Sequence, residues 1–474
     1  MEKGKTEFSL LSPKPNFEKF IFYLLVLLLP TQFGKHFWPA FSQVLGIRID
    51  YLSPTLYVTD LLILILFLSW LKRHLYLFPF RFSPFNYHLS TITLFLYLFL
   101  NILLSGNPLL GFYGFTKILE LFFLGYYVSQ NLKTKKEVAI IAAIFFITVI
   151  GESLLAIAQY IHQGSLNGLL YFLGERKFTA VTPGIANASI NGELILRPYG
   201  TFPHPNVLAG FLLCSLIIIY AWFEEKKDIK KQLLKATALL LGSLALFLTL
   251  SRVAIMLWIF LVIIALCEKL IKGNRLQFKK NLNHQSRHSH LLSCHSREGG
   301  NPIPVNKNNF SSINVWISSL LSIIFFISIL LLTPVLPRLK GTSFTEEAFS
   351  QRADLFKNTL IMIKDHPLFG VGLNNFIPSL SLIQKPLSST LYLQPVHNIF
   401  LLITAEIGII GLVFFLWFLF KTYNHLIYFR GNIRNTLLIL LSVILILGLF
   451  DHYWLTLQQG QLLFAIILGL CWVL

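Results

Sequence analysis

The chain has 474 residues, of which 55% are hydrophobic and only 13% are charged, and its mean hydropathy is +0.67. Apolar runs of about 20 residues recur along it, which is long enough to cross a bilayer core of about 30 Å. This composition excludes a set of soluble domains and predicts an all-α polytopic membrane protein. The net charge of +18 does not indicate nucleic acid binding, because the Lys and Arg residues cluster in short segments between the apolar runs.

Twelve apolar runs qualify as candidate spans and predict a single integral membrane domain over residues 1–474. They lie near 18–34, 55–71, 87–105, 112–130, 137–162, 204–223, 233–250, 252–271, 313–335, 395–421, 434–452 and 458–474. The first run is expected to stay in the membrane, because no small-residue cleavage site of a signal peptide follows it. The seventh and eighth runs are separated by a very tight turn at Leu250–Ser251–Arg252.

The distribution of basic residues predicts the orientation. If the N-terminus is cytoplasmic, 26 of the 39 Lys and Arg residues fall in cytoplasmic segments, although the outer loops are longer in total. Short cytoplasmic loops carry this excess of positive charge in membrane proteins. Both termini are therefore expected in the cytoplasm.

Two outer loops, 163–203 and 336–394, are large enough to contain structure of their own. The second has apolar positions at helical spacing up to Asp365–His366–Pro367, followed by a Gly-rich turn. This pattern predicts an amphipathic helix that ends before the proline and can lie along the outer membrane surface.

The cytoplasmic segment 272–312 is polar, basic and rich in histidine, without helical periodicity. Its stretch CHSREGGNP resembles the translated product of a mobile palindromic repeat, so we interpret the segment as an insertion. A cytoplasmic loop tolerates such an insertion because lengthening a loop costs little free energy. The cysteines of the chain form no Cys-x-x-Cys pair, so the cysteine pattern indicates neither a disulfide framework nor a zinc site. The alternative interpretation of this segment is a metal site built mainly from histidines, namely His284, His288, His290, Cys294 and His295.

Ionisable residues near the outer ends of the spans are the most informative positions. Burying a charge in a membrane is costly, so such residues indicate a function. They are Arg197, His204, Arg252, Arg352, His366, His397, Glu406 and the pair Asp451–His452. Arginines and histidines dominate, which suits an anion such as phosphate or pyrophosphate. Paired acids that would hold a divalent metal to a phosphate are missing, so no metal is expected.

Several of these residues also have a purely structural interpretation. Arg252 can snorkel to the interface, and Arg352 can pair with a nearby acid on a solvated face. His397 and Asn398 can form a helix cap, for which Asn398 is the better residue. A carboxylate at Glu406, inside the tenth span, requires a partner or a polar cavity.

The stretch RPYGTFPHPNVLAG, residues 197–210, is interpreted as a helix entry at the outer face. Pro205 suits a first helical turn, and Asn206 follows it. The free N–H groups of a helix N-terminus favour an anion beside Arg197. The stretch, with His204 at its centre, is therefore predicted to form one wall of an anion-binding mouth.

Four stretches resemble, in this order, the motifs of the O-antigen ligase/polymerase family: RPYGTFPHPNVLAG, LTLSRVAIM, QRADLFKNTLIMIKDHPLFGVGLNNF and VHNIFLLITAEIGIIGLVFFL. The resemblance extends mainly over 190–420, and the last two motifs are the more specific. It implies a C-type glycosyltransferase (GT-C) architecture in a bacterial inner membrane, with about twelve spans and a large periplasmic loop before the tenth.

The resemblance also implies a metal-independent glycosyltransferase without a cofactor. Such an enzyme moves glycan from a polyprenyl-pyrophosphate, such as undecaprenyl pyrophosphate, to an acceptor hydroxyl at the periplasmic face. Arg252 and Arg352 would bind the pyrophosphate and stabilise the charge on the leaving group. His397 would act on the acceptor hydroxyl as a general base or by orienting it. The further residues expected to bind substrate are Arg197, His204, Asn206, His366, Asn398 and Glu406.

Two alternatives stay open at this point. The acceptor can be lipid, as in a ligase that builds lipopolysaccharide, a glycan, as in a polymerase, or a protein. A transporter of an anion or a lipid-linked saccharide is the alternative from another class. A transporter would show inverted repeats and interrupted spans near mid-membrane, whereas here the polar residues gather at the outer face.

Overall fold

The computed structural model describes residues 15–76, 86–190, 193–222, 229–268, 271, 347–384, 392–429 and 433–473. The chain divides into two compact units, one of Met1–Ser251 with Gly341–Leu474 and one of Arg252–Lys340. The predicted span at 313–335 and the basic segment 272–312 lie outside the described residues. The interpretation of that segment as an insertion, its alternative metal site and the expectation of a single membrane domain stay predictions.

Each predicted span within the described residues coincides with a helix. The helices of the first unit are α1 (Pro15–Leu27), α2 (Val58–Tyr76), α3 (Asn86–Leu103), α4 (Pro108–Asn131), α5 (Lys135–His162), α6 (Pro205–Trp222), α7 (Ile229–Leu248), α11 (Glu347–Asp365), α12 (Phe376–Ile383), α13 (Ile399–Tyr428), α14 (Arg434–Gly448), α15 (Tyr453–Thr456) and α16 (Gln458–Cys471). In the second unit, residues 252–268 are helical. The tight turn before them places Leu250 at a positive φ of 53°.

The structure is that of a helical membrane protein. Within the described residues, α4, α5 and α13 are long and apolar enough to cross a membrane, and several shorter helices are equally apolar. The count of twelve spans, the GT-C architecture and the orientation of the termini stay predictions.

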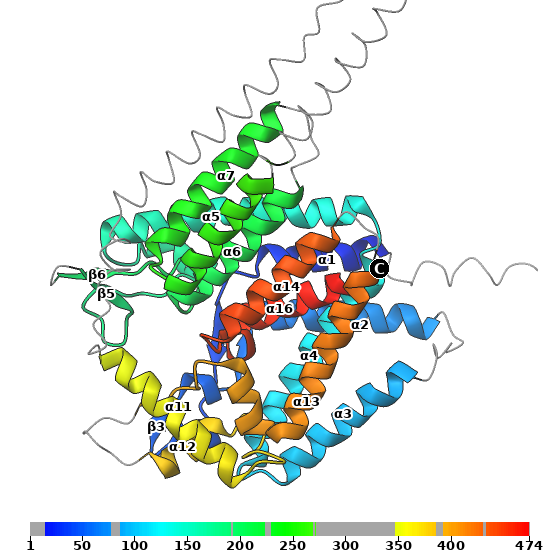
Figure 1. Cartoon of the computed structure of the whole chain (residues 1–474), viewed down its shortest axis with the longest axis vertical. Coiled ribbons are helices and arrows are strands. Elements are labelled where there is room, and N and C mark those ends of the chain that lie inside the picture. The colour runs from blue at the N-terminus through cyan, green and yellow to red at the C-terminus, as the bar shows by residue number, and fades with distance from the viewer. Residues whose placement is uncertain are drawn as a thin grey trace, which may run out of the picture. The chain divides into compact units, whose positions relative to one another are not determined.

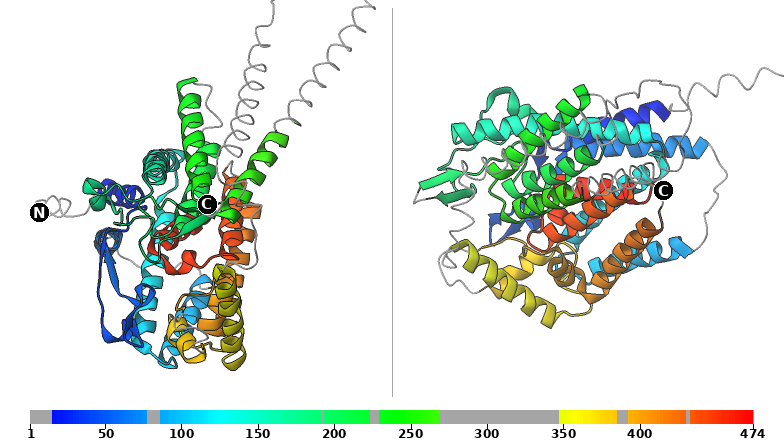
Figure 2. Two further views of the ribbon diagram at one scale, coloured as in Figure 1. Left: turned by 90° about the vertical axis from the view of Figure 1, so that its left-hand side faces the viewer. Right: turned by 45° about the horizontal axis from the view of Figure 1, so that its top comes forward.

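Close helix packing builds the core of the first unit. Helices α5, α6 and α7 lie side by side (Figure 1, Figure 2). Helix α16 packs along α4, where a Cβ on Gly469 would lie 2.6 Å from the carbonyl oxygen of Gly125. Small residues let helix backbones approach closely, which is how helices gain packing contacts in a membrane.

Short antiparallel strand pairs occupy the loops. Strand β1 (Gly34–His36) pairs with β4 (Thr55–Tyr57), β2 (Gln43–Val44) with β3 (Ile47–Arg48), and β5 (Asn187–Ile190) with β6 (Glu193–Leu196). Three 3₁₀ helices, η2 (Ala40–Ser42), η3 (Asp50–Leu52) and η4 (Gly168–Leu173), lie in the same loops. The loop 163–203 therefore contains η4 and the β5–β6 hairpin, and the chain continues from β6 directly to Arg197.

The predicted outer helix is present as α11, and it ends at Asp365 as expected. The Gly-rich turn after it packs into a kink of α13, where Gly408 has a positive φ of 66°. The Val371 N–H donates to the carbonyl of Ala405 at 2.8 Å. A Cβ on Gly408 would lie 2.0 Å from the carbonyl oxygen of Leu368, so glycine is required there for both conformation and space.

Candidate functional site

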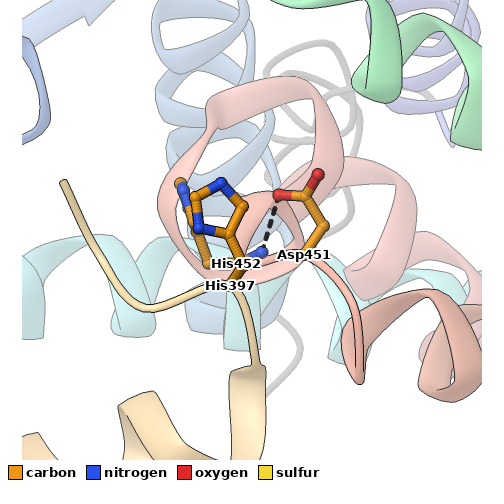
Figure 3. Close-up of side chains that lie close together, drawn as sticks. All are labelled: His397, Asp451 and His452. Atoms are coloured by element: carbon orange, nitrogen blue, oxygen red, sulfur yellow. Dashed lines mark hydrogen bonds between the residues drawn. The ribbon is translucent and has the colours of Figure 1, made fainter. Parts of the chain in front are cut away.

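Four polar residues meet between α6, α13 and α14, and we name them the histidine cluster: His204, His397, Asp451 and His452. His204 precedes α6, His397 precedes α13, and the other two follow α14, so all four lie outside the membrane-spanning helices. The ring centroids of His397 and His452 are 5.1 Å apart. Figure 3 shows these two rings beside the carboxyl group of Asp451.

Asp451 is the anion of the cluster. Its Oδ2 accepts a hydrogen bond from Asn206 Nδ2 at 2.7 Å, and its Oδ1 accepts one from the backbone N–H of His452 at 2.8 Å (Figure 3). Burial alone would raise the pKa of the carboxyl, but the positive charge that His452, His397 and His204 take up in acid, with the Asn206 hydrogen bond, outweighs burial and lowers the pKa to about 2. Asp451 is therefore ionised at neutral pH.

The histidines around this carboxylate are neutral. Burial lowers the pKa of His397 to about 3, with His452 and Arg352 adding to the effect against the opposing charge of Asp451. Burial and the charge of Arg197 likewise lower the pKa of His204 to about 3, and burial lowers the pKa of His452. The Nδ1 atom of His397 is buried and has no hydrogen-bond partner among the described residues. This ring can accept a proton, and the adjacent carboxylate can stabilise the resulting imidazolium.

Arg197 and Asn206 connect the cluster to three helices. Arg197 Nη2 donates to Asn206 Oδ1 at 2.6 Å, and Arg197 Nε donates to the carbonyl of Thr249 at 2.7 Å. Asn206 in turn holds Asp451, and its backbone N–H donates to His204 Nδ1 at 3.1 Å. The structure thus brings the predicted wall residues together with Asp451, and their substrate roles stay predictions.

Two buried polar side chains of α5 hold the loop that leads into this wall. Gln159 Oε1 accepts from the N–H groups of Tyr199 and Gly200 at 3.0 and 2.8 Å. Glu152 accepts from the backbone N–H and the hydroxyl of Thr201 at 3.0 and 2.7 Å. Gly200 has a positive φ of 59°, and a Cβ there would lie 2.3 Å from Glu152 Oε2. The loop conformation therefore depends on glycine and on α5.

Arg352 lies on α11, where it is exposed. Its positive charge contributes to the lowered pKa values of His397 and His452, so the guanidinium lies near the cluster. Among the described residues, no acid forms an ion pair with Arg352. The side chain thus presents a cation beside a neutral base.

Two other predicted residues have structural partners. Asn398 caps α13, because its Oδ1 accepts from the N–H groups of Phe400 and Leu401 at 2.9 and 3.0 Å. The carboxylate of Glu406 accepts from the backbone N–H groups of Asn374 and Phe376. The partner of this buried carboxylate is therefore the Gly-rich turn after α11, and the substrate-binding role of Glu406 stays a prediction.

His366 lies outside the cluster, and Arg252 lies outside the first unit. His366 follows the last residue of α11, fourteen positions after Arg352, and this separation is about 21 Å along a helix. Arg252 is the first residue of the second unit. The substrate-binding role of His366 and the catalytic role of Arg252 stay predictions.

Several residues at the site have no role that the sequence predicts. Asp451 and His452 had stood out only as ionisable residues at a span end. Tyr51 of η3 lies edge-on to His452, with ring centroids 5.4 Å apart. Glu152 and Gln159 can be identified from the sequence, because two polar residues seven positions apart share one face of a largely apolar helix.

His397, Asp451 and His452 are also spaced as metal ligands, with candidate ligand atoms within 4.8 Å of one another. Both oxygens of Asp451 already accept N–H groups, and His452 Nδ1 bonds to Thr456 Oγ1 at 2.7 Å. The positive charge of Arg352 near the cluster also opposes a second cation. The arrangement fits proton transfer better than cation binding.

Residues 237–416 match the family model described as O-Antigen ligase. No curated protein matches the chain. The match confirms the resemblance to the O-antigen ligase/polymerase family and indicates membrane glycosyltransferase activity of that type, which implies lipid-linked glycan substrates. Arg352 and His397 lie within the matched range, whereas Asn206 and Asp451 lie outside it and reach the site through the tertiary structure.

Proposed function

We propose that this protein transfers glycan from a polyprenyl-pyrophosphate donor to an acceptor hydroxyl at the periplasmic face of the bacterial inner membrane, without a metal. The observation that carries the proposal is the neutral His397, whose buried Nδ1 has no partner among the described residues and which lies beside the ionised Asp451. This pairing is what a general base requires. Arg352 supplies a positive charge close to that base.

Each side chain of the site has one role in the proposed reaction. The acceptor oxygen attacks the anomeric carbon of the donor sugar, and the bond from that carbon to the pyrophosphate oxygen breaks. His397 takes the hydroxyl proton, and the bonding electron pair leaves with the pyrophosphate. Asp451 stabilises the imidazolium, while Arg352, with Arg252 as the family motif suggests, stabilises the charge on the leaving group.

Donor binding improves His397 as a base. The pKa of His397 is low in the free protein because of burial, and the positive charge of Arg352 adds to this effect. A pyrophosphate bound to Arg352 offsets that positive charge, so the pKa of His397 rises when the donor is present. Proton uptake is therefore favoured when both substrates are bound.

Reconstitution of the full chain with undecaprenyl-pyrophosphate glycan and lipid, glycan or protein acceptors tests the proposal. We expect His397→Gln and Arg352→Ala to lower the rate of transfer about 100-fold or more, the range typical of a lost general base or charge-stabilising group. Lys364→Ala, an exposed cation on the same helix α11, is the matched control and should retain the wild-type rate. The acceptor that receives glycan identifies a ligase, a polymerase or a protein glycosyltransferase.

Two outcomes would reject the proposal. Full transfer by both site variants would show that the cluster does not perform the chemistry. Movement of the lipid-linked glycan across vesicle membranes, without transfer to any acceptor, would instead identify a transporter.

A further inference from the structure

A second polar site lies at the other end of α5 from the histidine cluster. It is a pocket of about 320 Å³ between the ends of α1, α2, α4 and α5, and Glu18, Arg73, Tyr127 and Glu137 are among the residues that line it. Glu137 is in the first turn of α5, whereas Gln159, which holds the loop before the histidine cluster, lies near its last turn. Twenty-two helical residues span about 33 Å, comparable to a bilayer core of about 30 Å.

Three buried polar atoms of this pocket have no hydrogen-bond partner among the described residues. They are Glu18 Oε1, Arg73 Nε and the hydroxyl of Tyr127. Glu18 and Tyr127 are each only 1% exposed. Their other contacts are fixed, since Arg73 Nη2 donates to Glu18 Oε2 at 2.9 Å and to Asn131 Oδ1 at 3.0 Å. Buried polar atoms are nearly always satisfied, so these atoms define an acceptor and two donors for a bound molecule.

The charges around the pocket have both signs. Arg73, Lys19 and Lys133 are cationic, and Glu18 and Glu137 are anionic. Lys19 already pairs with Glu137. A ligand that satisfies the remaining atoms places an acceptor at Arg73, for which an anion is the strongest choice, and a hydrogen-bond donor at Glu18. A phosphate with a neighbouring primary ammonium has this chemistry.

The surroundings place the pocket at the boundary between lipid and water. Trp70, one turn before Arg73 on α2, contacts Tyr126 and His74, with ring centroids 5.9 and 4.3 Å apart. Aromatic groups of this kind gather at the membrane interface. On α1, the apolar side chain of Phe20 is 60% exposed next to Lys19. An apolar surface beside a polar pocket suits a lipid better than a soluble ligand.

We propose that this pocket binds the headgroup of phosphatidylethanolamine. The phosphate lies at Arg73 and the hydroxyl of Tyr127, the ammonium donates to Glu18 Oε1, and the acyl chains run along the exposed apolar face of α1. The proposal does not rest on glycosyl transfer, because the pocket shares no residue with the histidine cluster.

Binding of matched lipids to the delipidated full-length protein tests this proposal. Native mass spectrometry would compare phosphatidylethanolamine, phosphatidylcholine and phosphatidylglycerol with identical acyl chains. Phosphatidylcholine has the same charges but no N–H to donate, and phosphatidylglycerol has no ammonium. We expect phosphatidylethanolamine to bind about ten-fold more tightly than either, as a charge-assisted hydrogen bond allows.

Substitutions of pocket residues test whether the preference for phosphatidylethanolamine arises in this pocket. Glu18→Gln should reduce the preference for phosphatidylethanolamine over phosphatidylcholine to about one, because the charged acceptor is lost. Lys133→Gln leaves the Glu18–Arg73 pair in place and should weaken the binding of phosphatidylethanolamine and of phosphatidylglycerol to the same extent. Lys136→Gln, exposed and outside the pocket, is the control and should change neither affinity.

Equal affinity of the wild type for the three lipids would overturn the proposal, and so would a lipid preference that survives Glu18→Gln. Soluble phosphoethanolamine that binds as tightly as the lipid would overturn the lipid assignment and identify the ligand as a free phosphorylated amine.

Discussion

Two groups of charged residues in the same unit differ in whether the protein neutralises their charges. In the Lys117 network, formed by Asp60, Lys117, Glu120 and Gln458, the Lys117 ammonium lies 2.9 Å from Asp60 and 3.0 Å from Glu120. Gln458 Oε1 accepts from the same ammonium at 3.2 Å. This network joins α2, α4 and α16, and its cation already has two anionic partners. Its arrangement is that of a structural cross-link.

The histidine cluster is the contrasting case. Its carboxylate is held by N–H donors rather than by a cation, its histidines are neutral, and His397 Nδ1 lacks a partner among the described residues. Arg352 lies nearby without an ion pair there. Groups that are not neutralised by the protein can act on a substrate, so a charge left without an opposite charge indicates function, whereas a cation held between two carboxylates indicates structure.

Removing the carboxylate of the histidine cluster should give the largest effect. Asp451→Asn is expected to lower kcat of glycan transfer about 100-fold or more, because the imidazolium of His397 loses its stabilising charge. Transfer rates and thermal unfolding of the purified variant check this. A lower Tm that accounts for the whole loss of activity would make Asp451 a structural residue like Asp60.

Breaking the Lys117 network should act on stability instead. Lys117→Met leaves two carboxylates without their cation and is expected to destabilise the fold by roughly 3–5 kcal/mol. Denaturant unfolding in detergent measures this loss, and the folded fraction should retain its rate of transfer. An unchanged unfolding midpoint with lost activity would reverse the roles assigned to the two groups.

The kink of α13, against which the Gly-rich turn after α11 packs, offers a test of intermediate size. Gly408→Ala introduces a Cβ 2.0 Å from the carbonyl of Leu368 at a positive φ of 66°, which should cost about 1–3 kcal/mol. Gly151→Ala is the control, because no atom lies within 4 Å of its added Cβ. That helical position should be neutral or gain up to about 1 kcal/mol. Equal Tm shifts in both variants would contradict the packing described for the kink.

The pH dependence of transfer separates a buried histidine from an exposed one. His397 is neutral in the free protein well below pH 6.5, since its pKa is about 3. We expect kcat/KM to change less than about two-fold between pH 7.5 and 5.5, whereas a base with a pKa of about 6.5 would lose about ten-fold.

The lowered pKa values of His397 and His204 also make the folded protein less stable in acid. The unfolded state takes up protons below about pH 6.5 while the folded cluster does not, so stability falls as pH falls from there towards about pH 3. Thermal unfolding at pH 5.5 must therefore confirm that the protein is still folded in the assay. A ten-fold acid loss in folded protein would contradict the buried, neutral state of His397.

Chelation should give the smallest effect. Because the carboxylate of Asp451 is occupied by N–H donors, we expect EDTA to leave the transfer rate unchanged. Loss of transfer that added Mg²⁺ or Zn²⁺ restores would assign His397, Asp451 and His452 to a metal site.

Local features were predictable from the sequence because they depend on residues a few positions apart. The apolar runs located the helices, Pro205 marked the start of α6, Asp365 the end of α11, and Asn398 the cap of α13. Each rests on hydrogen bonds and burial within one or two helical turns. The family motifs, read over short stretches, likewise indicated the glycosyltransferase type that the family match supports.

The partners of these residues were decided by the tertiary structure alone. Asn206 and Asp451 are 245 positions apart in the chain, and only the packing of α6 beside α14 places one against the other. The packing of the Gly-rich turn against α13 gives Glu406 its partners, and the packing of α1 against α2 and α5 leaves Glu18 facing a pocket. A sequence reveals that a buried charge needs a partner, because desolvation is costly wherever it occurs. Which group becomes that partner depends on long-range contacts that no local pattern contains.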